Sequence, residues 1–201
     1  MLKKWVREYI QINKRDILLV ISLILLGIIM GIGLYIFSPE DTRNLAISSV
    51  REVFNISKSN TYVKTNIIMN GIKVNMILMM ALAIFSVTLF GKWLIYAIML
   101  LKGAALSIYT ILLFKVFGVL WGTIVVFLLV ILVNMLYIPA FIYIVVNFLG
   151  LNFTIFKTRQ NNLIEIYKIF LSMIFSFAIM FSSIIVEQVV SGIVLNIYSK
   201  I

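Results

Sequence analysis

The 201-residue sequence contains neither cysteine nor histidine. Without cysteine it can form no disulfide, no thiol nucleophile and no thiolate metal site. Without histidine it has no imidazole for general catalysis or metal ligation, which excludes an intramembrane protease of the serine–histidine type. An intramembrane aspartyl protease needs two aspartates at membrane depth, whereas Asp16 and Asp41 flank the first apolar run. The sequence therefore predicts a protein that is not an enzyme and that binds no cofactor and no metal.

Charged residues are also scarce. They make up 12% of the chain, while 63% of its residues are hydrophobic; a soluble domain needs roughly a quarter of its residues charged. This composition predicts a single membrane domain over residues 1–201, an all-α polytopic integral membrane helical bundle. The formal charge of +10 does not indicate nucleic-acid binding, because the basic residues stand at the ends of apolar runs. There they are placed to meet anionic membrane lipids.

Five apolar runs are long enough to predict about five transmembrane helices. They cover residues 17–37, 72–90, 93–114, 123–149 and 166–190. Short amphipathic interfacial helices accompany them, and residues 2–12 fit one, which either lies on the membrane surface or is a solvated basic tail. Five basic residues precede the first run, which predicts a cytoplasmic N-terminus and an extracytoplasmic C-terminus.

The polar segment of residues 38–66 is then extracytoplasmic. Ser38-Pro39-Glu40-Asp41 is typical of a helix start, because serine caps, proline suits the first turn and acids complement the helix dipole. This segment either docks an external partner or lies along the membrane surface. In the preceding run, Gly27 and Gly31 have the G-x-x-x-G spacing that allows another helix to approach closely.

The run over residues 123–149 contains two features that are unusual in lipid. Pro139 removes a backbone hydrogen bond and clashes with the preceding turn, so we expect it to kink or break the helix. Asn134 carries an amide that is costly to expose to lipid. We therefore predict that this span packs inside the bundle, with Asn134 bonded to a neighbouring helix.

Lys102 lies in the middle of a predicted span, and Glu187 is the only acid inside one. A lysine at mid-span costs about 2.5–3.5 kcal/mol on insertion scales. Either Lys102 faces a polar bundle interior, or the helix breaks at Gly103 so that Lys102 lies near a helix end. A Lys102–Glu187 ion pair requires that break, since otherwise the two residues lie at different depths. The same residues could alternatively line a transport path.

Three patterns resemble the stage II sporulation protein M family. They are Leu101-Lys102-Gly103, the segment from Asn134 through Ile138-Pro139-Ala140-Phe141, and Ser182-Ser183 followed by Glu187 and Ser191. The resemblance implies a non-enzymatic, multi-pass scaffold in the mother-cell membrane of a spore-forming bacterium. Such a scaffold anchors two extracytoplasmic peptidoglycan hydrolases, a lytic transglycosylase and an amidase/endopeptidase, for septal wall thinning and forespore engulfment during sporulation.

Two other functions stay open at this point. One is a permease-like subunit of a transporter, with Lys102, Asn134 and Glu187 along the path. The other is a member of the same family with an unrelated role in an organism that does not sporulate. The oligomeric state is open as well.

Overall fold

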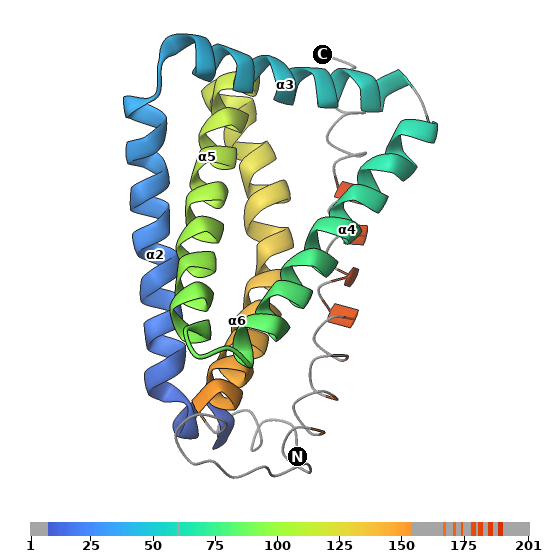
Figure 1. Cartoon of the computed structure of the whole chain (residues 1–201). Coiled ribbons are helices and arrows are strands. Elements are labelled where there is room, and N and C mark those ends of the chain that lie inside the picture. The colour runs from blue at the N-terminus through green and yellow to red at the C-terminus, as the bar shows by residue number, and fades with distance from the viewer. Residues whose placement is uncertain are drawn as a thin grey trace.

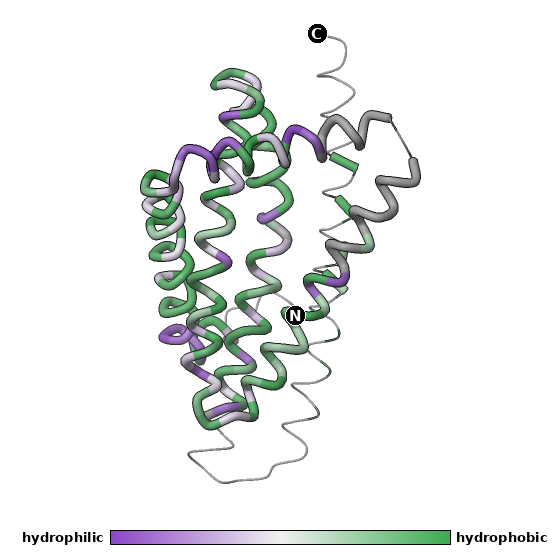
Figure 2. The backbone as a smooth tube through the Cα atoms, turned by 45° about the horizontal axis from the view of Figure 1, so that its top comes forward, coloured by the Kyte–Doolittle hydropathy of each residue, from purple (hydrophilic) through white to green (hydrophobic). Residues whose placement is uncertain are grey.

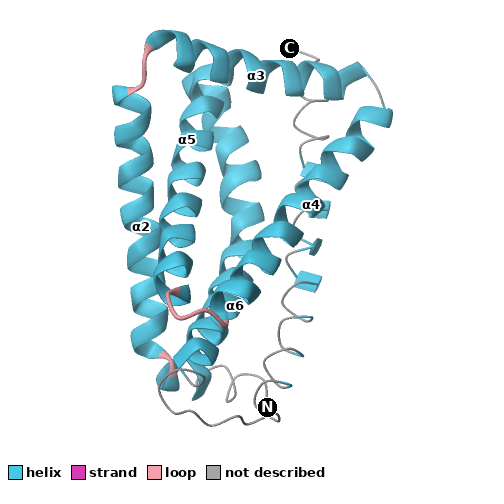
Figure 3. Ribbon diagram, viewed as in Figure 1, coloured by secondary structure: helices cyan, strands magenta, loops and turns pink. Residues whose placement is uncertain are grey.

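The computed structural model describes residues 8–59 and 61–153, and beyond them residues 167, 171, 174, 178–179, 181–182, 185–186 and 189–190. These residues are helical apart from short connections, and no strand occurs among them (Figure 3). The all-α prediction is confirmed at this level. Two helices, Lys14–Phe37 and Gly91–Asn152, are long and apolar enough to cross a membrane, and a shorter apolar helix spans Lys73–Ser86.

Helix α2 (Lys14–Phe37) coincides with the first predicted span. It ends because Ser38 adopts an extended conformation before Pro39, and the Ser38 hydroxyl donates to the carbonyl of Leu34 at 2.6 Å. Proline disfavours helical geometry in the residue before it, which explains this sharp end. Helix α3 (Glu40–Ser59) follows directly and crosses one end of the bundle (Figure 1). The predicted helix start at Ser38–Asp41 is confirmed.

Helix α4 (Thr61–Ser86) runs back diagonally from the far end of α3 (Figure 1). The span predicted over residues 72–90 extends too far, since the helix ends at Ser86 and a turn occupies residues 87–90. The hydroxyls of Ser86 and Thr88 donate to the carbonyls of Ala83 and Phe85. Such side chains compete with the helical hydrogen bonds, and an apolar run alone does not reveal that competition.

Helix α5 (Gly91–Val126) contains a chain reversal at Gly118, which has φ 75° and ψ −178°. This conformation is strained for any residue with a Cβ, so glycine suits the position. The first arm, residues 91–117, packs along α2, and the chain then returns beside it (Figure 1). The reversal falls in the gap between the predicted runs 93–114 and 123–149.

The helical arm that returns after Gly118 corresponds to the predicted fourth span. It comprises the end of α5, a π-helical segment η1 (Phe127–Leu132) and helix α6 (Val133–Phe153). Helix α6 continues past Leu149, where the predicted span ends. Apolar side chains from α2, α4, α5 and α6 form the main core; its largest fully buried members are Phe141, Phe148, Leu82, Ile95, Met99 and Ile144.

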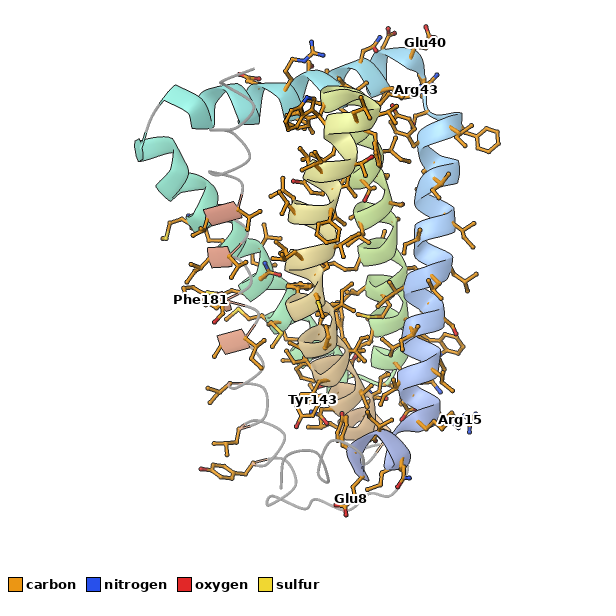
Figure 4. The ribbon with its side chains drawn as sticks, turned by 180° about the vertical axis from the view of Figure 1, so that it is seen from behind. Glu8, Arg15, Glu40, Arg43, Tyr143 and Phe181 are labelled. Carbon is orange, nitrogen blue, oxygen red and sulfur yellow. The ribbon has the colours of Figure 1, made fainter. Side chains whose placement is uncertain are left out.

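The surface of the helices is strongly apolar, and charged residues lie at both ends of the bundle. Hydrophobic residues dominate α2 and α5, whereas α3 carries hydrophilic positions (Figure 2). Glu40 and Arg43 mark one end of the bundle, and Glu8 and Arg15 mark the opposite end (Figure 4). Along the predicted fifth span, six large apolar residues among those described are exposed: Tyr167, Leu171, Ile174, Phe181, Ile185 and Val189. Their spacing places an apolar stripe on one helix face.

Candidate functional site: a polar cluster between the helices

Lys102 lies half-buried on α5 and faces α6. Its Nζ atom is 4.7 Å from the ring centroid of Tyr137 and 5.8 Å from that of Phe141. These distances are typical of cation–π attraction, which strengthens when the cation is shielded from water. Of the two placements predicted for Lys102, the one with a helix break at Gly103 is wrong, because α5 passes through that position without interruption.

Tyr137 connects Lys102 to a third helix. The tyrosine is buried, stacks on Phe141 with centroids 5.6 Å apart, and donates its hydroxyl to Oδ1 of Asn75 at 2.8 Å. Since Asn75 belongs to α4, the set joins α4, α5 and α6. We call Asn75, Lys102 and Tyr137 the polar cluster. The sequence analysis did not identify Tyr137 or Asn75 as site residues, because a tyrosine and an amide in separate spans give no local signal of their contact.

Within the part of the chain that the structure describes, Asn134 bonds its own helix and not a neighbouring one, contrary to the prediction. Its Nδ2 donates to the carbonyl of Val130, one turn earlier on its own chain, at 2.7 Å. That carbonyl also accepts the backbone N–H of Val133 at the end of the π-helical segment. The π-helix disturbs the regular ladder, and the Asn134 amide supplies a donor within it. The polar residue therefore stabilises an irregular helix.

Pro139 does not break its helix. Helix α6 runs through it without interruption, and Pro139 is exposed, away from the core. The departure from α-geometry in this span is the π-helix, which ends before Asn134. Proline is tolerated in such helices when nearby geometry adjusts to the missing hydrogen bond. Of the two expected effects, a kink or a break, the break is therefore wrong and the kink stays a prediction.

Gly103 lies in the contact between α5 and α2. A Cβ built on it would meet the carbonyl of Ile24 and lie 3.0 Å from the Cα of Gly27. Gly27 and Gly31 on α2 are buried in the same contact, against Ala104 and Ser107 of α5 among others. We call Gly27, Gly31, Gly103, Ala104 and Ser107 the glycine seam. The close approach predicted from the G-x-x-x-G spacing is confirmed for Gly27 and Gly31.

Glu187 lies outside the described residues. The pairing of Lys102 with Glu187 therefore stays a prediction. Its stated condition, a helix break near Gly103, is not met by α5.

Asn152 closes the turn between α4 and α5. It is buried, and its Nδ2 lies 2.9 Å from the carbonyl oxygens of both Ser86 and Thr88, to which it donates. The carbonyls at a helix end have no partners within the helix. Asn152, on α6, supplies a donor for that of Ser86 at the end of α4 and for that of Thr88 in the turn. Asn152 was not predicted as a structural residue, because it lies beyond the predicted end of the span at residue 149.

Replacing Asn152 by leucine should destabilise the bundle by about 2 kcal/mol, because the buried carbonyl of Ser86 loses its donor. The carbonyl of Thr88 loses the same donor but keeps the backbone N–H of Gly91. Thermal unfolding of the purified chain in detergent would measure the loss. Asn44, which is exposed on α3, is the matched control, and leucine there should change the stability by no more than about 0.5 kcal/mol. Equal behaviour of the two variants would contradict the assigned role.

Tyr9 attaches the N-terminal helical turn to α6. Its hydroxyl donates to Oδ1 of Asn147 at 3.1 Å, and its ring lies 4.8 Å from that of Tyr143. Burial, with smaller contributions from Tyr143 and Asp16, raises the pKa of Tyr9 above its ordinary value. At least this part of the predicted amphipathic helix of residues 2–12 is packed on the bundle; residues 2–7 lie outside the described residues.

The raised pKa of Tyr9 predicts a loss of stability in alkali. The folded state favours the neutral phenol, so its contribution is complete below the unfolded pKa of about 10. It is lost as the pH rises from there through the higher folded pKa. Unfolding midpoints measured between about pH 8 and pH 11 should fall more steeply for the wild type than for Tyr9→Phe, which cannot ionise. Parallel curves would contradict this account.

The polar groups described above mainly link helices to one another. Lys102 and Tyr137 connect α5 with α6, Asn75 brings in α4, and Asn152 joins α6 to the α4–α5 turn. Within the described part of the chain, no group of three histidine, cysteine, aspartate or glutamate side chains could hold a metal ion. What the arrangement does chemically is stabilise an apolar bundle from within.

Comparison of the chain with models of protein families, with curated proteins and with solved structures finds no match.

Proposed function

We propose that this chain is a multi-pass scaffold of the cell membrane. In this proposal five spans cross the bilayer, the N-terminus is cytoplasmic, and α3 and the C-terminus are extracytoplasmic. The scaffold holds extracytoplasmic peptidoglycan-degrading enzymes, a lytic transglycosylase and an amidase/endopeptidase, at the septal membrane of a sporulating cell. This follows the resemblance to the stage II sporulation protein M family.

The observation that carries the proposal is the use of the polar side chains inside the apolar helices. Lys102, Asn75, Tyr137 and Asn152 are engaged with other helices, and polar contacts of this kind join helices where lipid surrounds them. Apolar exposed faces, charged ends and the glycine seam are further features suited to a rigid membrane bundle. A scaffold needs such rigidity and an external surface, and it needs no catalytic group.

The topology can be tested directly because the chain has no cysteine. Single cysteines introduced at Leu45 on α3 and at Lys14 at the start of α2 should behave oppositely. A membrane-impermeant maleimide added to intact cells with a permeable outer envelope should label position 45, and position 14 only after the membrane is disrupted. Labelling of position 14 in intact cells would overturn the orientation, and labelling of both positions would overturn the membrane crossing by α2.

The scaffold role requires a second experiment. The tagged full-length chain is purified from sporulating cells in mild detergent, and the co-purified proteins are assayed for peptidoglycan hydrolysis. We expect hydrolase activity to co-purify with the chain and not with an unrelated multi-pass protein carrying the same tag. If hydrolase activity co-purifies with neither protein, the scaffold role is overturned.

The polar cluster also supports a second candidate, a permease-like subunit of a transporter. Lys102 is a half-buried cation within an apolar helix, and such residues commonly mark substrate or ion pathways. Solute flux into proteoliposomes that falls on Lys102→Ala, while the variant stays folded, would favour this function. Unchanged flux would remove the support that Lys102 gives it.

A further inference from the structure

Four residues form one stripe along α3. Asp41, Leu45, Ser48 and Glu52 follow each other at spacings of four, three and four residues, which places them on a single helix face. All four are exposed, and Leu45 is 69% exposed. We call them the acidic stripe. It has an acid at each end and one large apolar side chain between them.

The opposite face of α3 is turned toward the bundle. Its half-buried residues are Arg43, Ala46, Ile47 and Val50, which share the same helical spacing. Helix α3 contacts α5 and α4 and lies across the end of the bundle (Figure 1). The acidic stripe therefore points away from the other helices and away from the apolar flanks of the bundle.

The surface around Leu45 is less polar than its sequence indicates. Ser48 and Ser49 both turn their hydroxyls back to the carbonyl of Leu45, at 2.9 and 2.8 Å. These donors are therefore engaged within the helix and are not directed at a ligand. What remains is an apolar knob with a carboxylate on either side along the helix.

The charge of the acidic stripe selects between the possible occupants. The chain as a whole carries +10, yet both charged members of the stripe are acidic, and Glu40 adjoins them at the start of α3. Anionic lipid headgroups would be repelled by these carboxylates. A protein surface with an apolar recess between two basic side chains would complement them. At 1.5 Å per residue, the two basic groups would lie roughly 16 Å apart.

We propose that the acidic stripe is the surface on which the scaffold docks its extracytoplasmic partner, through a basic segment that receives Leu45. This inference rests on the proposed function, in which α3 lies outside the cell. Leu45 anchors the complex, since a few apolar or aromatic side chains supply most of the affinity at interfaces. Asp41 and Glu52 orient the partner and exclude acidic surfaces.

The first test uses a defined probe and the full-length chain in nanodiscs of neutral phosphatidylcholine. The probe is a helical peptide with two lysines spaced to match Asp41 and Glu52 around an alanine-lined recess. Its twin carries glutamate in place of lysine. We expect the lysine peptide to bind the wild type, and to bind Leu45→Ala about tenfold more weakly. Its binding to the wild type should also weaken at high salt. The double variant Asp41→Lys/Glu52→Lys should reverse the preference between the two peptides.

Arg51 provides the matched control, because it is exposed on α3 but lies off the stripe. Arg51→Gln should still bind the lysine peptide at least as well as the wild type does. Failure of the double variant to change the preference would overturn the inference. So would binding of the wild-type nanodiscs to phosphatidylglycerol vesicles that Leu45→Ala abolishes, since that would make lipid the occupant.

The second test separates this inference from the proposed function. Hydrolase activity co-purifying with wild type should fall at least about tenfold with Leu45→Ala and with the double lysine variant, and stay unchanged with Arg51→Gln. Undiminished recovery with the stripe variants would overturn the docking surface and leave the scaffold role standing. The opposite outcome is also informative. If no hydrolase activity co-purifies with the wild type, but the double lysine variant reverses the peptide preference, the scaffold role is overturned and the stripe is supported as a protein-binding surface.

Discussion

Replacing Gly31 by leucine should force α2 away from α5 and destabilise the bundle by about 3 kcal/mol or more. Gly31 is buried, and a Cβ built on it would meet the Ser107 hydroxyl and lie 2.7 Å from the Cα of Ala104. Backbone atoms of a packed helix cannot rotate away as a side chain can. Overpacking of this kind commonly costs about 1–3 kcal/mol and sometimes more, and at Gly31 the helices themselves must move.

Gly33 gives this experiment a matched control two residues further along the same helix. A Cβ there has no neighbour within 4 Å, so Gly33→Leu changes helix propensity and lipophilicity to the same degree without a clash. Thermal unfolding in detergent should separate the two variants clearly, with Gly33→Leu close to the wild type. Equal midpoints would show that the glycine seam does not limit how closely α2 and α5 pack.

Replacing Tyr137 by leucine should cost about 2–4 kcal/mol, the second large effect. The variant removes the ring face beneath Lys102, an interaction of about 2 kcal/mol when the cation is shielded from water. It also removes the hydroxyl that donates to Oδ1 of the half-buried Asn75, a hydrogen bond that contributes about 0.5–1.5 kcal/mol. Tyr137→Phe separates the two contributions, because it keeps the ring and loses only the hydroxyl.

A double-mutant cycle tests whether the contribution of the Tyr137 ring depends on the charge of Lys102. If the ring acts on the Lys102 cation, Tyr137→Leu should cost less in a Lys102→Met background, where no charge remains. The cost of Tyr137→Phe should be nearly the same in both backgrounds, since the hydroxyl bonds Asn75 on another helix. Additive effects of Lys102→Met and Tyr137→Leu would contradict a coupling between the two residues.

The turns at Gly118 and at residues 38–39 were predictable because their signals are local. Proline after serine ends α2 through a clash between neighbouring residues. Gly118 lies in a short stretch with Lys115 and Trp121, as is typical of an interface between apolar runs. The end of α4 was less predictable, because it depends on Asn152, which contacts Ser86 from another helix. A contact between residues so far apart leaves no pattern in either segment.

Composition and the length of the apolar runs predicted apolar helices, because a single run of about 20 residues that enters lipid can satisfy its own backbone hydrogen bonds only as a helix. They also singled out Lys102, Asn134 and Pro139 as unusual. Only the tertiary structure decided what these residues do. In the folded chain Lys102 lies over the ring of Tyr137, Asn134 donates to the carbonyl of Val130, and Pro139 is exposed. The reason is physical: a costly polar group takes the nearest available partner, and that partner is set by how the helices pack.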